Sequence, residues 1–445
     1  MKKILSIILT SILFISGLGA GAILIQETPL KQPVILDEYD MVIIAPSLFS
    51  EALHQLIDHK ISLGIQTFLK TMEEIYKEYK GRDNAEQIKY FIKDALEQWN
   101  ITYVLLVGSI NLLPIRTSAV QWYGPDNETL VVEDIITDLY YADIYDENDS
   151  FCSWDSNEND IFGEAIYYTV ETGNPGEMID DVDLYSDASV GRLPCTNNRE
   201  LEICIDKIIH YETQTYNYQW FHNMLLMGGD QYLSSSGWDD DKINEGEIVV
   251  DQIAQIRSEF NHIKLKTSKH TFLPFRINYE INKGVGFVGF SGHGFPNGFG
   301  LHPHEKERLI KYYSLYRFGL HNGNKLAVIF FHACLTAKLD YNKWGLELPC
   351  IAWNLIKMRY GGVIAAIGST RTGYSYTNEE EGAIEGGSRL IVEFFKAYKP
   401  GIIFSDMFIK AQNEYLQNVW DDAITIEEYN IIGDPSLRIG GYPAI

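Results

Sequence analysis

The sequence contains a series of short apolar runs, each of which ends at a turn-forming or polar residue. Continuous runs of this length predict strands that are buried on both faces of a parallel sheet. They lie at residues 40–45, 103–108, 224–227, 285–290, 326–331 and 362–367. Residues 49–60, 85–99 and 198–212 have helical periodicity, and Asn84 is a plausible N-cap of the second helix. The alternation predicts an α/β fold built on mostly parallel sheets.

Three of the later strands lead into a reactive side chain. The run at 224–227 leads to Asp230, the run at 285–290 leads to His293, and the run at 326–331 leads to Cys334. Binding sites in open α/β sheets form beyond the carboxyl ends of the strands, so neighbouring parallel strands would place these residues in one crevice. A thiol, an imidazole and a carboxylate are the groups needed for covalent acyl transfer.

Glycines on both sides of His293 strengthen that interpretation. Gly292 and Gly294 allow a sharp turn that exposes a backbone amide beside the imidazole ring. The N–H groups of Gly294 and Cys334 could then form an oxyanion hole, whose donors each contribute roughly 3–4 kcal/mol in a transition state. His332 would point away from Ala333, so we interpret it as a packing or hydrogen-bonding residue.

An apolar strand ending in His-Gly, followed by one ending in Ala-Cys, resembles the signature of caspase-like cysteine peptidases. More specifically, the chain is similar to the gingipain family, peptidase family C25. Six further segments look familial, at residues 103–108, 138–143, 154–157, 190–194, 209–212 and 433–437. The resemblance extends in order over roughly residues 37–440.

The resemblance implies a caspase-like α/β/α sandwich in two closely packed subdomains, residues 37–215 and a catalytic part at 216–440. It implies a cysteine endopeptidase that acts on proteins or peptides and needs no catalytic cofactor. Cys334 would be the nucleophile, His293 the general acid and base, Asp230 the residue that orients the imidazole, and Gly294 an oxyanion donor.

Two residues are candidates for substrate binding. In the arginine-cleaving members of the family an aspartate lies at the base of the primary specificity pocket, and a loose, gapped match places it at Asp241. A carboxylate there would pair with Arg or Lys at P1, the substrate residue before the cleaved bond. The acids near Asp241 could instead be first-turn residues that the helix dipole favours. Tyr374 is the second candidate.

Two other functions remain open. The same thioacyl intermediate could pass to an amine, as in a sortase-like transpeptidase. The chain could also be a non-catalytic, calcium-binding surface protein, although a binding module would have no reason to keep Cys334, His293 and Asp230 together.

The negative charge is concentrated in one segment. Between Arg116 and Arg192 there are 19 Asp and Glu and no Lys or Arg, in a chain of net charge −25. A chain this acidic is a poor electrostatic partner for nucleic acid or for anionic lipid. Oxygen side chains at Asp155, Asn157, Asn159 and Glu164 suit a structural calcium ion, or an Asx-rich turn without an ion.

The N-terminus predicts export. Two lysines precede an uncharged stretch at residues 4–25, which is typical of a secretory signal at residues 1–25 or an uncleaved membrane anchor. An exported chain could oxidise its remaining cysteines, and sequence does not choose among the pairings of Cys152, Cys195, Cys204 and Cys350. The stretch from His302 to Glu305 reads as a polar surface loop.

Overall fold

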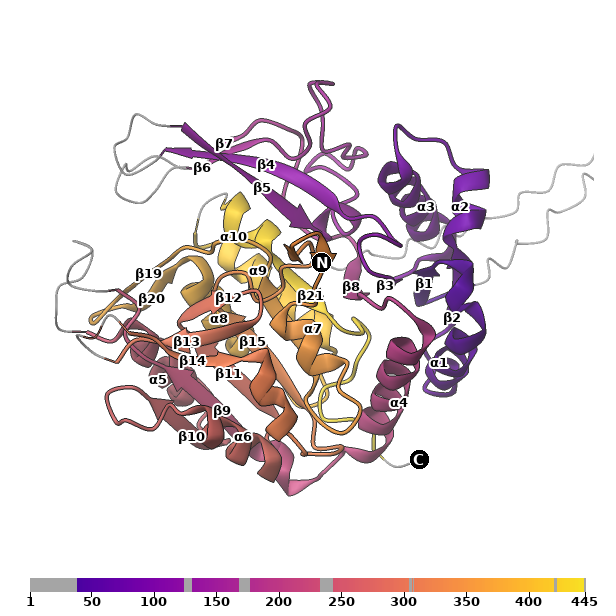
Figure 1. Cartoon of the computed structure of the whole chain (residues 1–445). Coiled ribbons are helices and arrows are strands. Elements are labelled where there is room, and N and C mark those ends of the chain that lie inside the picture. The colour runs from indigo at the N-terminus through magenta and orange to yellow at the C-terminus, as the bar shows by residue number, and fades with distance from the viewer. Residues whose placement is uncertain are drawn as a thin grey trace, which may run out of the picture. The chain divides into compact units, whose positions relative to one another are not determined.

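A ten-stranded sheet runs through the described part of the chain (Figure 1). The computed structural model describes residues 38–123, 130–167, 177–232, 243–303, 306, 308–419 and 422–443. Contacts divide the chain into Met1–Leu36 and Asp37–Ile445, so every described residue belongs to the second unit.

The strand order of this sheet is β10-β9-β11-β15-β18-β21-β8-β3-β1-β2. One half of it contains β9 (Asn223–Gly228), β10 (Asn261–Lys266), β11 (Phe287–Ser291), β15 (Ala327–His332), β18 (Val363–Ser369) and β21 (Tyr429–Ile432). Its other half contains β1 (Met41–Ala45), β2 (Thr67–Thr71), β3 (Tyr103–Val107) and β8 (Ser189–Leu193). All neighbouring pairs are parallel except β18 and β21, which are antiparallel.

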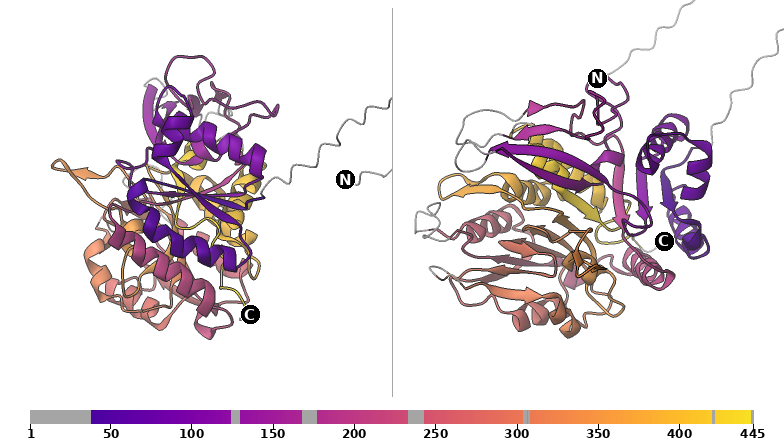
Figure 2. Two further views of the ribbon diagram at one scale, coloured as in Figure 1. Left: turned by 90° about the vertical axis from the view of Figure 1, so that its right-hand side faces the viewer. Right: turned by 45° about the horizontal axis from the view of Figure 1, so that its top comes forward.

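Helices lie on both faces of the sheet (Figure 2). They include α1 (Ser50–Ser62), α3 (Asn84–Trp99), α4 (Asn198–Gln214), α5 (Glu245–Ile256), α6 (Pro274–Lys283), α7 (Ile351–Ile356), α8 (Gly386–Ala397) and α9 (Phe404–Leu416). Because both faces are covered, the central strands are almost wholly apolar and buried, as the continuous apolar runs predict. The predicted α/β/α architecture is confirmed.

The predicted helix boundaries hold with one correction at an N-cap. The cap of α3 is Asp83, whose extended backbone (φ −148°, ψ 179°) precedes the helix and whose carboxylate accepts from the Glu86 N–H at 2.9 Å. Asn84 is already the first helical residue, so the prediction that it caps the helix is wrong. Asp and Asn are both good N-cap residues, so residue type does not choose between them. Asp83 is the N-cap because its backbone is extended, whereas the backbone of Asn84 is already helical.

The acidic segment forms a second, four-stranded sheet beside the main one (Figure 1). It consists of β4 (Arg116–Tyr123), β5 (Leu130–Thr137), β6 (Ala165–Tyr167) and β7 (Glu177–Met178). Helix α10 (Ala423–Glu428) packs against β5 and β6. There the Ser118 hydroxyl, on β4, donates to the fully buried carboxyl group of Glu427.

A buried lysine on α1 pairs with two carboxylates from distant parts of the chain. Lys60 on α1 forms ion pairs with Glu212 on α4 at 2.9 Å and with Asp434, just after β21, at 2.6 Å. All three side chains are inaccessible to solvent. Because a buried charge is costly without its partner, this pairing fixes where α1, α4 and the C-terminal segment meet.

Two predictions about organisation stay predictions. The division into subdomains at residues 37–215 and 216–440 is one, since the main sheet is continuous across both parts. The other is the N-terminal signal or anchor, because residues 1–25 lie outside the described part of the chain. Within the described part, no helix is both long and apolar enough to cross a membrane.

The burial of Glu427 predicts how stability depends on pH. Burial raises the pKa of Glu427 to about 8, so the folded state holds its proton more tightly than the unfolded state does. The corresponding stability is fully present below the unfolded pKa of about 4.3 and is lost as the pH rises through about 8. We expect the melting midpoint to fall several degrees less between pH 5 and pH 9 in Glu427→Gln, which keeps the acceptor for Ser118.

The matched control is Glu414→Gln, which removes an exposed carboxylate on α9. It should keep the wild-type dependence on pH. The melting midpoint of each variant is measured by calorimetry between pH 5 and pH 9. If the midpoint depends on pH equally in both variants, Glu427 titrates as an ordinary carboxylate.

Candidate active site

The carboxyl ends of three neighbouring strands are aligned in one row. Gly228 at the end of β9 pairs with Ser291 at the end of β11, and Ser291 pairs with His332 at the end of β15. Asp230, His293 and Cys334 each lie two residues beyond this row. The parallel register therefore brings the predicted reactive residues to one edge of the sheet.

Gly294 brings the histidine segment against the cysteine. His293 begins the short strand β12 (His293–Phe295), and a Cβ at Gly294 would overlap the carbonyl oxygen of Cys334. A larger residue at Gly294 would push β12 away from the end of β15. The glycine is therefore required for close approach, a constraint that the Gly-His-Gly sequence already indicates.

A backbone carbonyl holds the ring of His293. Its Nε2 atom lies 2.8 Å from the carbonyl oxygen of Gln231. A carbonyl oxygen can only accept, so Nε2 donates and, in the neutral ring, Nδ1 keeps its lone pair. Burial, and secondarily the nearby ring of His302, lowers the pKa of His293 from its usual 6.5. The imidazole is therefore neutral at neutral pH.

Gln231 is itself fixed by a buried network. Its N–H donates to Glu245 at 3.0 Å, and its side-chain amide donates to the Ser291 hydroxyl at 2.9 Å. The Ser291 hydroxyl lies 2.9 Å from Nδ1 of His332. Burial lowers the pKa of His332 to about 3, so its ring is neutral and one tautomer of it accepts at Nδ1 from Ser291. The interpretation of His332 as a hydrogen-bonding residue is confirmed.

Cys334 is a protonated thiol in this arrangement. Its Sγ atom lies 3.7 Å from the carbonyl oxygen of Gly373. Burial, with a smaller contribution from the carboxyl group of Glu428, raises the pKa of Cys334 to about 11. A neutral thiol needs a base before it can attack, and a neutral imidazole is a suitable base. The other four cysteines are buried and, like Cys334, free of disulfides.

The remaining predicted site residues have different positions. Asp230 is buried, and its backbone forms an isolated bridge with His302. Tyr374 follows Gly373 and lies close enough to Cys334 for their ionisations to interact. Asp241 lies outside the described residues.

His302 and Gln231 were missed by the sequence analysis. The prediction that the stretch beginning at His302 is a polar surface loop is wrong for His302, which is buried and lies edge-on to His293 with ring centroids 5.0 Å apart. Only its position, nine residues after His293 across two glycine-rich strands, hints at this return.

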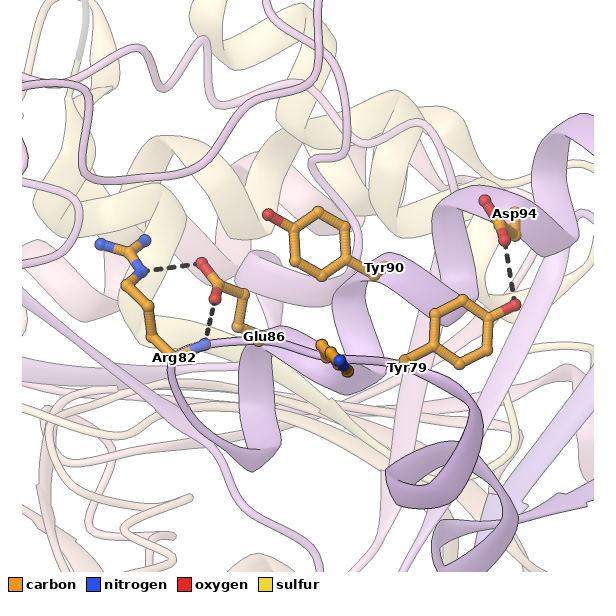
Figure 3. A pocket seen from close by; sticks show the side chains of 7 residues that line it. Tyr79, Arg82, Glu86, Tyr90 and Asp94 are labelled. Carbon is orange, nitrogen blue, oxygen red and sulfur yellow. Dashed lines mark hydrogen bonds and ion pairs between the residues drawn. The ribbon is translucent and has the colours of Figure 1, made fainter.

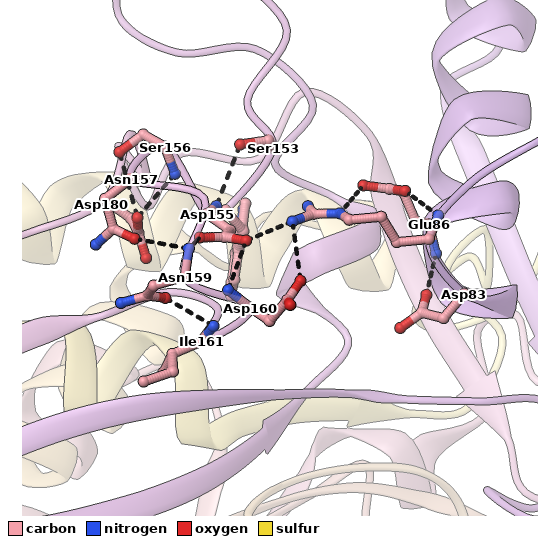
Figure 4. Close-up of polar contacts among 12 residues, drawn as sticks. Asp83, Glu86, Ser153, Asp155, Ser156, Asn157, Asn159, Asp160, Ile161 and Asp180 are labelled. Carbon is pink, nitrogen blue, oxygen red and sulfur yellow. Dashed lines mark hydrogen bonds and ion pairs between the residues drawn. The ribbon is translucent and has the colours of Figure 1, made fainter.

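The segment predicted to bind calcium has its oxygens occupied by donors from the protein (Figure 4). Asp155 accepts from the Arg82 guanidinium and from the backbone N–H groups of Asn159 and Asp160. Glu164 accepts from the side-chain amides of Asn157 and Asn159, at 2.9 and 2.7 Å. Within the described ranges, no group of three His, Cys, Asp or Glu could hold a metal ion. This arrangement does not fit calcium as it stands, and calcium binding remains a prediction.

Arg82 also borders a surface pocket (Figure 3). The pocket has a volume of about 560 Å³ and is lined by residues between Tyr79 and Asp94, on and before α3. Arg82 pairs with Glu86 at 2.8 Å, and the Tyr79 hydroxyl donates to Asp94 at 3.0 Å. These four polar side chains of the pocket are therefore paired within the protein.

Peptidase family C25 matches residues 35–440, which include both strand ends that carry the thiol and the imidazole. The chain belongs to this family. The predicted family resemblance is thereby confirmed.

Individual relatives agree with the family. Gingipain R2 of Porphyromonas gingivalis is 23% identical over 410 residues, which cover 90% of this chain and 46% of that protein. Gingipain R1 of Porphyromonas gingivalis is 22% identical over 90% of this chain and 34% of that protein. The chain therefore spans less than half the length of these curated relatives.

Solved structures confirm the fold. The crystal structure of the Arg-specific cysteine proteinase gingipain R superposes with a TM-score of 0.66 at 20% identity, covering 90% of this chain and 78% of that one. A complex of the pro- and mature domains of RgpB from Porphyromonas gingivalis superposes with a TM-score of 0.65 at 21% identity, covering 90% and 79%.

Replacing Arg82 tests what balances the charge of Asp155. The Asp155 side chain is inaccessible, whereas Arg82 is about one-third exposed, so we expect Arg82→Gln to cost about 1–3 kcal/mol. The vacated position should then admit a cation, so millimolar calcium should raise the melting midpoint of the variant and EDTA should not change that of the wild type.

Arg359→Gln, which removes an exposed guanidinium elsewhere, is the control and should melt like the wild type. A wild-type midpoint that falls in EDTA would instead establish the calcium ion that the sequence predicts.

Proposed function

We propose that this chain is an exported cysteine endopeptidase that hydrolyses peptide bonds through Cys334 and His293. The observation that supports the proposal is the aligned row of strand ends, because the strands that lead into His293 and Cys334 end at one sheet edge. Membership of a cysteine peptidase family supports it.

The reaction begins with the neutral pair. Nδ1 of His293 takes the Sγ proton of Cys334, and the sulfur attacks the substrate carbonyl carbon. The tetrahedral oxyanion is bound by the N–H groups of Gly294 and Cys334. It collapses with breakage of the C–N bond, while the imidazolium returns the proton to the leaving amine. Water, activated by the same imidazole, then hydrolyses the thioester and frees the thiol.

Positioning of His293 involves two successive residues. The Gln231 carbonyl accepts from Nε2–H and so selects the tautomer that leaves Nδ1 as the base. Asp230, one residue earlier, orients the imidazole as the resemblance implies. Its bridge to His302, whose ring packs on His293, gives it a route to do so.

The substrate is proposed to carry Arg or Lys at P1. The structure of a similar protein is described as an Arg-specific proteinase. Asp241 supplies the pairing carboxylate and Tyr374, beside Cys334, lines the pocket. Export through residues 1–25, by a cleaved signal or a retained anchor, would bring the enzyme to extracytoplasmic proteins and peptides.

Substitution of the two catalytic residues tests the reaction. Cys334→Ala should abolish turnover, because no other nucleophile lies at that strand end. His293→Ala should lose nearly all turnover, because the thiol then has no base. Asp230→Ala should lower kcat less than His293→Ala does, because an orienting carboxylate does not itself move the proton. In the wild type, kcat/KM should rise with pH through a pKa below 6.5, where the imidazole becomes neutral.

The assay is cleavage of a peptide library, with covalent labelling by a peptidyl acyloxymethyl ketone and melting curves for every variant. A folded Cys334→Ala protein within tenfold of wild-type activity would remove the assignment. Product mass spectrometry with an added peptide amine separates the alternatives, since a transpeptidase yields the amide and a non-catalytic surface protein yields no product and no label.

The specificity pocket has its own test. Asp241→Asn should lose basic P1 substrates selectively, by roughly 30- to 4,000-fold in kcat/KM, the usual effect of removing one member of a buried charge pair. Cleavage after an apolar P1 residue should change little. Wild-type cleavage mainly after apolar or acidic residues would reject the pocket assignment and leave Cys334 and His293 untouched.

A further inference from the structure

Helix α6 and the neighbouring 3-10 helix η6 (Ser314–Gly319) present large apolar side chains to solvent. Phe275 on α6 is 70% exposed, and Leu315 and Phe318 on η6 are each 72% exposed. Tyr279 and Tyr316 are also exposed. Exposed apolar groups gathered in this way mark an interaction surface more often than isolated ones do.

Hydrogen bonds show that the two elements form one surface. The Asn278 amide on α6 donates to the carbonyl oxygen of Tyr316 at 2.8 Å, and the Asn282 amide donates to that of Gly319 at 3.0 Å. Phe275 and Tyr279 are four residues apart on α6, so they share a stripe that adjoins the stripe of Asn278 and Asn282. We call the five exposed apolar residues, with Arg276, Lys283 and Arg317, the α6–η6 face.

Two cations of this face lie over its aromatic rings. Lys283 lies 4.1 Å from the ring centroid of Tyr279, and Arg317 lies 4.6 Å from that of Phe318. The one acid on these two elements, Glu280, is buried and pairs with Arg276 and Lys283 at 2.8 and 3.0 Å. The face is therefore apolar and basic, with no exposed acid of its own.

The charge of the face is opposite to that of the chain. Residues 261–325 contain ten Lys and Arg against three Glu, whereas the whole chain has a net charge of −25. An anionic partner attracts this basic region and repels the acidic remainder of the protein. The protein therefore approaches such a partner with the basic region facing it.

We propose that the α6–η6 face docks on an anionic lipid bilayer. A bilayer of this kind offers negative headgroups at its surface and an apolar phase a few ångströms below, which match the cations and the rings of the same face. Phe275, Leu315 and Phe318 enter the interface while Arg276, Lys283 and Arg317 pair with lipid phosphates. The catalytic residues play no part in this contact.

The test places an environment-sensitive fluorophore on the face of the full-length protein. In a Cys334→Ala background, Leu315→Cys carries the dye, and a matched protein carries it at Leu346→Cys, another well exposed leucine (64%) on β17 (Leu346–Glu347). Because both proteins contain residues 1–37, any binding by the N-terminal segment is common to them. The probes are phosphatidylcholine vesicles with and without one-third phosphatidylglycerol.

We expect the dye at position 315 to shift its emission to the blue with the anionic vesicles only, and the dye at position 346 not to shift. In 0.5 M salt the shift at position 315 should be at least threefold smaller. Adding Lys283→Gln and Arg317→Gln should weaken the apparent vesicle affinity at least tenfold, and Arg276 is kept so that the buried Glu280 retains an ion-pair partner. Melting curves check that the variant is folded. No shift at 315, or equal shifts at both positions, would overturn the proposal. A shift at 315 that grows with protein concentration in the absence of lipid would assign the face to a second copy of the chain instead.

Discussion

The parallel register of β9, β11 and β15 is the constraint on which the site depends. Because Gly228, Ser291 and His332 are paired in one row, whatever follows each strand by two residues meets at the same place. The row is held by backbone hydrogen bonds between buried apolar strands, and a one-residue slip would turn each strand's side chains to the opposite face. The geometry of the site is therefore as stable as the core itself.

Burial determines the protonation states that the chemistry starts from. It raises the pKa of Cys334 to about 11, lowers that of His293, and lowers that of His332 to about 3. All three are neutral near neutral pH, so each has a definite hydrogen-bonding role. The Ser291 oxygen accepts from the Gln231 side chain and lies at hydrogen-bond distance from Nδ1 of His332, and the Gln231 carbonyl holds His293.

The sequence could predict the parts of this arrangement that have a local signature. Buried strands appear as continuous apolar runs, and the Gly-His-Gly and Ala-Cys ends follow them directly. It could not predict Gln231 or His302, because a backbone carbonyl carries no residue-type signal and His302 returns to the site through the pairing of two short strands. The same limit applies to the Asp155 segment. Its alternating oxygens favour calcium, but the sequence does not reveal that Arg82, 73 positions earlier, occupies the carboxylate.

The fold also explains how so uneven a distribution of charge is tolerated. The acidic segment has no base of its own, and arginines from outside it pair with two of its buried carboxylates. Arg192 pairs with Asp138 at 2.7 Å, and Arg82 pairs with Asp155. Guanidinium groups suit this role because they stay charged when buried and offer several donors in fixed directions. The bases of residues 261–325 lie on other elements and mostly pair locally or remain exposed. Acidic and basic residues that are separated along the sequence thus also lie on different elements of the fold. The acidic residues lie on and around the sheet of β4 to β7, and the basic residues of the α6–η6 face lie on α6 and η6.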